Sequence, residues 1–162
     1  DYNLWPPFAQ TILVLLMFVG GCSGSTAGSI KCGRILLLLR SSTRSLLRLS
    51  HPRAVRVVKL DGKVVDEETL RTVSSFFLCF FALLGVGCLV VSLDGYSLTT
   101  SFTAALGCLS NVGPGLDLVG PMGNFGLLSG FNKVFLSLLM LIGRLEIFPI
   151  LLLFLPSTWR RS

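Results

Sequence analysis

The chain has 162 residues, of which 52% are hydrophobic and only 14% are charged, and its mean hydropathy is +0.78. Soluble domains carry about a quarter charged residues, so this composition argues against a soluble enzyme. The formal net charge of +6 argues only weakly for a nucleic-acid partner, because long stretches of the chain have no charge at all.

Three uncharged stretches, 2–30, 72–93 and 95–116, each exceed the roughly 18 residues that a bilayer-spanning helix needs. Ten of the fourteen basic residues instead lie between Lys31 and Arg71. Lys and Arg accumulate in the cytoplasmic loops of membrane proteins. A nucleic-acid surface or a solvated face is the alternative for such a basic segment, but its apolar flanks favour an inner loop over 41–69.

The first elements in chain order are a short helix, a turn and a longer helix. An apolar block over 8–19 would form a helix about 18 Å long, too short for a hydrocarbon core of about 30 Å. Small residues rich in glycine follow over 20–28, and a helix with a basic far end is predicted over 30–49. We expect these elements to form one unit, 1–50, followed by a cytoplasmic connection over 51–69.

The second unit, 70–162, has a similar order. A membrane helix is predicted over 72–93, and a second short helix over 98–109. A glycine and proline turn over 110–115 follows, and a helix over 131–155 can return across the membrane.

The short helix, glycine turn and long helix therefore occur twice, and a further long helix precedes only the second copy. We expect that the first copy lacks its opening helix and that the sequence begins inside something longer. Internal duplication with short, interrupted apolar segments in matching positions is typical of a transport pathway. The predicted fold is an all-α polytopic membrane protein.

The two glycine turns carry the chemistry of this hypothesis. Irregular backbone at membrane depth is tolerated only where it is buried in protein or lines a water-filled path. Rings of backbone carbonyls can there replace the hydration shell of a monovalent cation, and Gly24 and Gly113 are the central glycines. The spacing of Gly20, Gly24 and Gly28 equally fits the packing of membrane helices, whereas Pro114 in the second turn breaks a helix.

Arg144 lies inside the predicted 131–155 helix. A charge near mid-bilayer is costly and generally faces a water path or a partner. We interpret Arg144 as an electrostatic barrier beside a cation path. The alternative is that it pairs with a carboxylate elsewhere and only holds helices together.

Enzymatic, metal-binding and phosphate-binding functions find little support. The five cysteines have no CxxC spacing, and a single histidine does not complete a zinc site. No glycine-rich run ends in the Gly-Lys-Ser/Thr of a phosphate-binding loop. The titratable residues near the later segments form no nucleophile–base pair by spacing: Asp94, Asp117, Lys133, Arg144 and Glu146. We therefore expect neither an enzyme nor a covalently bound cofactor.

Four motifs resemble the membrane subunit of the Trk-type (TrkH-like) potassium uptake family, in order and over essentially the whole chain. They are Gly20-Gly21-Cys22-Ser23-Gly24-Ser25-Thr26-Ala27-Gly28-Ser29-Ile30-Lys31, His51-Pro52-Arg53-Ala54-Val55, Ser110-Asn111-Val112-Gly113-Pro114-Gly115 and Gly143-Arg144-Leu145-Glu146-Ile147-Phe148. The resemblance implies a potassium-channel-like fold of four repeats, each a membrane helix, a pore helix, a filter loop and a membrane helix. This chain would hold most of the third repeat and all of the fourth.

Carried over by position, the resemblance assigns eight filter residues: Cys22, Ser23, Gly24, Ser25, Asn111, Val112, Gly113 and Pro114. Potassium, the transported ligand, would bind to backbone carbonyls, those of Cys22, Ser23, Asn111 and Val112 among them. Arg144 matches the family's arginine below the filter. Ser29 departs from the family, which usually has a second glycine there, and this places helix packing at that point in doubt.

The resemblance also implies a homodimer in the cytoplasmic membrane of a prokaryote, with residues 41–69 and the C-terminus inside. A cytoplasmic nucleotide-binding (TrkA-like) subunit would open the pore, and the 41–69 loop could contact it. Two of four filter strands cannot enclose an ion, so this chain alone would not conduct unless two copies assemble. The alternative is a non-conducting membrane remnant or scaffold.

Overall fold

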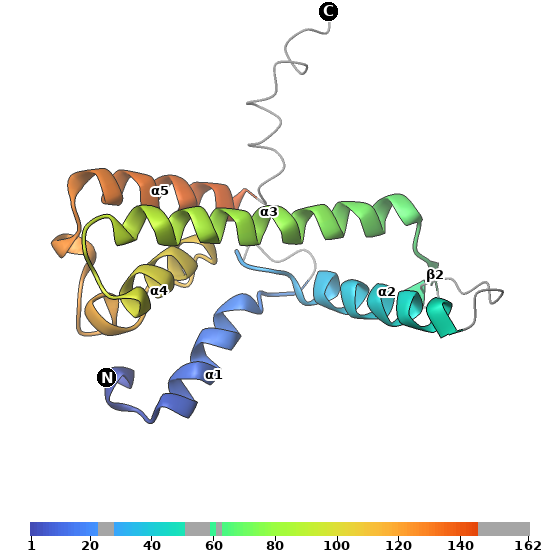
Figure 1. Ribbon diagram of the computed structural model, residues 1–162, viewed down its shortest axis with the longest axis horizontal. Coiled ribbons are helices and arrows are strands. Elements are labelled where there is room, and N and C mark those ends of the chain that lie inside the picture. The colour runs from blue at the N-terminus through green and yellow to red at the C-terminus, as the bar shows by residue number, and fades with distance from the viewer. Residues whose placement is uncertain (23–27, 51–58, 61–62, 146–162) are drawn as a thin grey trace, which may run out of the picture.

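The structure, a computed structural model, describes residues 1–22, 28–50, 59–60 and 63–145 (Figure 1). Five α-helices make up most of this part: α1 Pro7–Phe18, α2 Cys32–Ser50, α3 Glu67–Ser92, α4 Leu98–Leu109 and α5 Gly130–Arg144. Short 3₁₀ turns lie at Tyr2–Leu4, Asp117–Val119 and Phe125–Leu127. Two-residue strands, β1 Lys59–Leu60 and β2 Lys63–Val64, pair antiparallel between α2 and α3.

The helix ends can be compared with the predicted ranges. Helix α4 has the predicted bounds of 98–109, and α1 begins and ends one residue before the predicted 8–19. Residues 41–50 of the predicted inner loop continue α2 as a helix. For the helix predicted over 131–155, the structure describes α5 as far as Arg144, and residues 146–155 lie outside the described part.

Helix α3 begins at Glu67, five residues before the predicted start at 72. The Asp66 side chain accepts a hydrogen bond from the Glu67 amide at 2.8 Å, and Glu67 and Glu68 occupy the first turn. Acidic side chains stabilise the N-terminal end of a helix because that end carries partial positive charge. These charges, which the sequence prediction assigns to a loop, are thus a helix-start signal.

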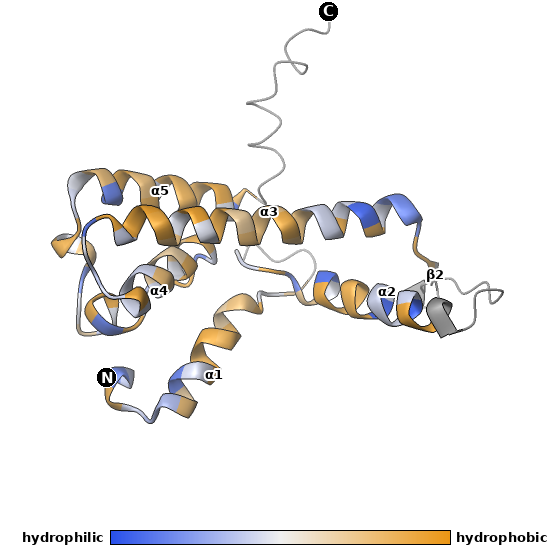
Figure 2. Ribbon diagram, viewed as in Figure 1, coloured by the Kyte–Doolittle hydropathy of each residue, from blue (hydrophilic) through white to orange (hydrophobic). Residues whose placement is uncertain are grey.

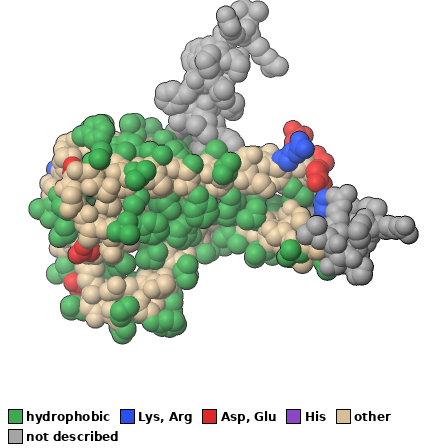
Figure 3. Space-filling view, in the orientation of Figure 1, with side chains coloured by type: hydrophobic (Ala, Val, Ile, Leu, Met, Phe, Trp, Pro, Cys, Tyr) green, Lys and Arg blue, Asp and Glu red, His purple; other side chains and the backbone are tan. Residues whose placement is uncertain are grey.

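Helix α3 is the one described helix that is long and apolar enough to cross a membrane. Its 26 residues correspond to about 39 Å, whereas the 12 residues of α1 and of α4 correspond to about 18 Å each. Hydrophilic residues of α3 lie at its N-terminal end, beside the far end of α2, and the rest of the helix is largely apolar (Figure 2). In the space-filling view, acidic and basic side chains gather at this same end (Figure 3).

Contacts between α2 and α3 stabilise that charged end. Arg44 donates two 3.0 Å hydrogen bonds to the carboxylate of Glu67. Nearer the start of α2, the guanidinium of Arg34 lies 4.2 Å from the ring centre of Phe76, within the range of a cation–π interaction. These contacts join the last helix of the first predicted unit to the first helix of the second.

Helix α4 packs against α3, α5 and the end of α1 (Figure 1). Nine of its twelve residues are buried, whereas α1, of equal length, has no buried residue. Its side chains Leu106 and Leu109 are fully buried in a core that also includes Phe80 and Leu139. The most enclosed helix is thus one of the two that are too short to span a bilayer, and it leads directly into the second glycine turn.

Candidate ion-binding turns

Backbone hydrogen bonds join the two ends of the first turn (residues 20–29). The Gly20 amide donates to the Ile30 carbonyl at 2.9 Å, and the Ile30 amide donates to the Phe18 carbonyl at 3.2 Å. Cys22 is exposed where the chain leaves this pairing. Three of the predicted site residues, Ser23, Gly24 and Ser25, lie outside the described residues. The described residues thus show that the two ends of this turn are hydrogen-bonded to one another at the C-terminal end of α1.

The backbone conformation at Ser29 is one that glycine adopts more readily than serine. Its φ is +67°, in the left-handed region that side chains other than glycine and asparagine rarely adopt. Its hydroxyl donates to the carbonyls of Met17 at 2.9 Å and Phe18 at 2.5 Å. These carbonyls end α1 and have no partner further along the helix. Ser29 therefore has a strained backbone conformation, and its hydroxyl caps the C-terminal end of α1.

Substitutions of Ser29 should separate these two effects. We expect Ser29→Ala to lower the free energy of unfolding by about 1–3 kcal/mol, because it keeps the strain and removes the hydroxyl from the Met17 carbonyl, while the Phe18 carbonyl keeps only the Ile30 amide. Ser29→Gly should cost less, since relief of the left-handed strain, about 1 kcal/mol, offsets part of the loss. Thermal unfolding of the detergent-solubilised full-length protein measures both. Equal losses would show that the strain at Ser29 is not significant.

The second turn (residues 110–115) folds back onto the end of α4. The amides of Val112 and Gly113 both donate to the Gly107 carbonyl, at 3.0 and 3.3 Å. Asn111 has φ +56° and Gly113 has φ +104°. Two left-handed residues in three positions reverse the chain direction at once, which a continuous helix would not allow.

Gly107 lets the returning chain approach α4. A Cβ atom at this position would lie 3.0 Å from the Gly113 carbonyl oxygen and 3.5 Å from that of Pro114. The carbonyls of Gly113 and Pro114 are therefore packed beside the helix. Sequence reasoning did not single out Gly107, although a glycine inside an apolar helix is a signal of close backbone approach.

The carbonyl oxygens of Asn111 and Val112 have a different environment. Within the described part of the chain, no hydrogen-bond donor reaches either of them. Val112 is 48% exposed, and Asn111 is partly exposed. These two oxygens are thus available to a ligand, in contrast to the amides of the same turn.

The N-terminal segment forms hydrogen bonds with the C-terminal end of the second turn and with the residues after it. The Tyr2 hydroxyl donates to the Gly115 carbonyl at 3.0 Å. Asn3 makes a double link to the backbone of Asp117, accepting from its amide at 2.9 Å and donating to its carbonyl at 3.2 Å. Neither Tyr2 nor Asn3 was predicted to belong to the site, because their partners lie more than 110 positions away in the sequence.

Asp117 also fastens the beginning of α4. Thr100 and Ser97 donate their hydroxyls to Asp117 Oδ2 at 2.6 and 2.7 Å. These hydrogen bonds, that of Thr100 first, hold the pKa of Asp117 below its usual range, so the carboxylate is ionised at neutral pH. A negative charge near the N-terminal end of a helix interacts favourably with the helix dipole. The Asp117 side chain therefore stabilises the N-terminal end of α4 through Ser97 and Thr100.

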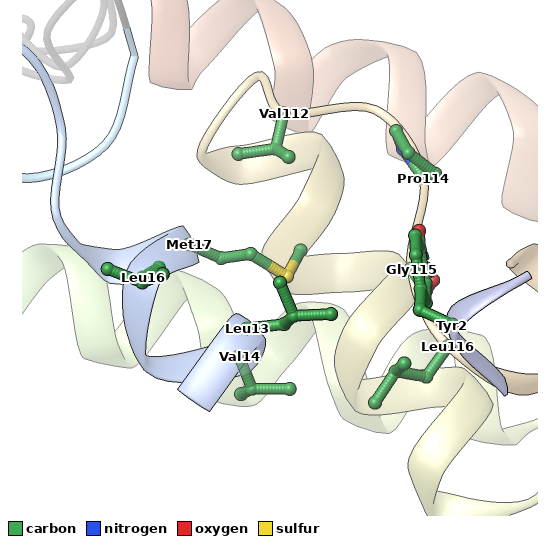
Figure 4. Close-up of a pocket in the computed structure, with 9 residues that line it drawn as sticks. All are labelled: Tyr2, Leu13, Val14, Leu16, Met17, Val112, Pro114, Gly115 and Leu116. Atoms are coloured by element: carbon green, nitrogen blue, oxygen red, sulfur yellow. Dashed lines mark hydrogen bonds between the residues drawn. The ribbon is translucent and has the colours of Figure 1, made fainter. Parts of the chain in front are cut away.

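A cavity of about 250 Å³ separates α1 from the second turn (Figure 4). Leu13 and Met17 extend into it from α1, and Val112 and Pro114 lie on the side of the turn. Its walls are mainly apolar, and none of the residues that line it is charged.

The two turns meet directly. A Cβ atom at Gly28, at the end of the first turn, would lie 2.6 Å from the Ser110 carbonyl oxygen and 2.9 Å from the Asn111 Cβ. The structure therefore brings the end of the first turn against the start of the second. Since Gly24 lies outside the described residues, its position relative to Gly113 stays a prediction.

Arg144 is the last residue of α5 and is exposed. It makes no ion pair with any described residue, so the alternative of a carboxylate partner gains no support from this part of the chain. Its neighbour Gly143 packs against the end of α4, where a Cβ atom would overlap the Leu109 carbonyl. This contact places the helix end that carries Arg144 beside the second turn.

The described residues contain no cluster of three His, Cys, Asp or Glu that could hold a metal ion. The arrangement instead offers backbone oxygens at the end of a half-length helix, and such ends carry partial negative charge. Backbone oxygen is a ligand for hard monovalent cations.

The comparisons with known proteins agree with a cation-transporting class. A family model described as "TrkH: Cation transport protein" matches residues 1–161. The chain belongs to this TrkH family. The family's members are ion transporters rather than enzymes.

Individual relatives are similar over nearly the whole chain. The Trk system potassium uptake protein TrkG of Escherichia coli (strain K12) is 38% identical over 160 residues, which cover 99% of this chain and 33% of that protein. TrkH of Salmonella typhimurium is 39% identical over 156 residues, covering 96% and 32%. The crystal structure of the potassium transporter TrkH from Vibrio parahaemolyticus matches with a TM-score of 0.87 at 39% identity, covering 96% of this chain and 33% of that chain. The chain thus spans about a third of the length of the relatives it matches.

Proposed function

We propose that this chain forms part of the pore of a potassium uptake protein in the cytoplasmic membrane of a prokaryote. In this proposal α1 and α4 are pore helices, and the two turns are filter strands of the third and fourth repeats. Helices α2, α3 and α5 are membrane helices around them. Membership of the TrkH family and similarity to proteins named as potassium transporters support this proposal.

One observation about the second turn carries the proposal. Its amides at Val112 and Gly113 turn toward α4, while the carbonyls of Asn111 and Val112 have no donor among the described residues. In lipid, a carbonyl without a hydrogen-bond donor costs roughly several kcal/mol at membrane depth, unless it lines a water path or binds an ion. A dehydrated potassium ion supplies that partner, and the C-terminal end of α4 adds partial negative charge.

We place the remaining filter ligands by the family's pattern. Cys22 and Ser23 would supply carbonyls from the first turn, with Gly24 and Ser25 completing that strand. Gly113 and Pro114 would complete the second strand, supporting it through their contact with Gly107. The other two strands would come from repeats outside this sequence, so the chain alone is not expected to conduct unless two copies assemble.

The basic segment sets the orientation and the regulatory contacts of the proposal. Arg44 bonds to Glu67 at the charged end of α2 and α3, Arg71 lies one turn further along α3, and positive residues favour the cytoplasmic side. Residues 41–69 would then face the cytoplasm, with the C-terminus on the same side. This end would contact a TrkA-like nucleotide-binding subunit, and the whole protein would assemble as a homodimer.

Ion flux into proteoliposomes tests the proposal. The full-length protein that contains this segment should take up ⁸⁶Rb⁺, a potassium substitute, and unlabelled K⁺ should compete better than Na⁺. Empty liposomes and heat-inactivated protein are the controls. A correctly inserted protein that carries neither ion would contradict potassium transport.

A further inference from the structure

The side chain of Asn111 joins the second turn to α5. Its Nδ2 donates to the Met140 carbonyl at 3.1 Å, while its backbone holds φ +56°. Asparagine is one of the few residues that adopt this backbone conformation readily, so the position combines a required backbone with a specific donor. The hydrogen bond spans 29 positions in the sequence.

The acceptor of this bond lies in the turn of helix that carries Arg144. In an α-helix the carbonyl of residue 140 pairs with the amide of residue 144, and α5 ends at Arg144. The Asn111 amide therefore bonds to the same oxygen that holds the backbone of Arg144. One residue earlier, Gly143 packs against the Leu109 carbonyl, where a Cβ atom would overlap it.

Neighbouring backbone leaves little freedom for the Asn111 side chain. A Cβ atom at Gly28 would lie 2.9 Å from Asn111 Nδ2, and one at Gly143 would lie 3.1 Å from it. Glycines of two other segments thus both lie against this amide, although its hydrogen bond to Met140 is exposed. A movement of the first turn or of the end of α5 must displace the Asn111 amide or break its hydrogen bond.

We propose that Asn111 is a positioning residue whose side chain sets the geometry of the second filter strand and couples it to the end of α5 that carries Arg144. The inference rests on the proposed function, since it concerns the same carbonyls. A fixed amide keeps the Asn111 and Val112 carbonyls at the spacing that suits K⁺. Displacement of α5 pulls on the same bond and changes that spacing.

Two variants of the full-length protein remove the link differently. Asn111→Gly permits φ +56° but has no donor, so the strand keeps its backbone conformation and loses its attachment. Asn111→Asp keeps the shape but directs a carboxylate oxygen at the Met140 carbonyl. Asn124→Asp is the matched control, because the exposed Asn124 accepts from the Gly126 amide, which a carboxylate can also do.

The readout is the ratio of ⁸⁶Rb⁺ to ²²Na⁺ uptake in proteoliposomes, for protein that elutes as a single species. We expect both Asn111 variants to lower this ratio about fivefold, the effect of one net hydrogen bond, and Asn124→Asp to leave it unchanged. Wild-type protein without Rb⁺ uptake would contradict the proposed function. Wild-type uptake with an unchanged ratio in Asn111→Gly would contradict only the positioning role.

Coupling is measured by combining Asn111→Gly with Arg144→Ala. If the bond transmits changes from α5, the double variant should have the basal flux of one single variant rather than the product of both effects. Multiplicative effects would show that Asn111 acts on the strand without coupling to Arg144. Deletion of a merely structural contact would lower thermal stability and leave both the ion ratio and this pattern unaltered.

Discussion

Replacing Gly113 by serine in the full-length protein is expected to reduce the preference for K⁺ over Na⁺ about tenfold, corresponding to ~1.4 kcal/mol. Gly113 has φ +104°, a backbone conformation that residues with a side chain rarely adopt. A Cβ atom at this position would meet nothing within 4 Å. The substitution therefore acts through the backbone alone, and relaxation of φ rotates the peptide that carries the adjoining carbonyls.

Gly95 provides a control with the same kind of strain. It has φ +79°, and a Cβ atom there would also meet nothing within 4 Å, but it lies in the turn after α3, away from the second turn. Gly95→Ser should lower thermal stability about as much as Gly113→Ser does and leave the ratio of Rb⁺ to Na⁺ uptake unchanged. If both variants keep the wild-type ratio, the conformation of Gly113 does not determine selectivity.

The order of the helices could be predicted from the sequence because the membrane environment imposes a strong constraint on composition. Glycine-rich turns end the short apolar blocks over 8–19 and 98–109, whereas 72–93 is apolar without such a break, and this difference distinguishes the 12-residue α1 and α4 from the 26-residue α3. The predicted start of α3 is wrong by five residues, because Glu67 and Glu68 resemble a loop by charge and a helix start by position. These two residues thus fit either a charged loop or a helix start, and in the structure they form the first turn of α3.

The second turn could be located from Gly113 and Pro114, but its supports could not. Gly107 and Gly143 matter because other parts of the backbone lie against them; a glycine inside an apolar helix indicates such an approach but does not say which part of the chain makes it. Tyr2 bonds to the Gly115 carbonyl across 113 positions, a separation that gives no periodic signal. Sequence reasoning therefore found the residues whose own conformation is unusual and missed those that hold them in place.

Arg144→Ala is expected to raise the basal flux of Rb⁺ about tenfold, since a unit positive charge near a cation path opposes entry by roughly 1 kcal/mol or more. Arg144 is exposed at the end of α5 and makes no ion pair with any residue that the structure describes. Gly143 keeps this helix end beside α4, where the Leu109 carbonyl lies. The charge thus acts close to the proposed filter strand.

Two further variants separate charge from packing in this experiment. Arg144→Lys keeps the charge and should retain the low basal flux, whereas Arg71→Ala removes an exposed arginine from the charged end of α3 and should change nothing. Basal ⁸⁶Rb⁺ uptake is measured at equal protein density, without a regulatory subunit. Unchanged or lower flux in Arg144→Ala at normal protein level would favour the alternative in which the arginine only holds helices together. Raised flux in Arg144→Ala together with low flux in Arg144→Lys would show that the positive charge at this position, rather than the planar geometry of the guanidinium, keeps the basal flux low.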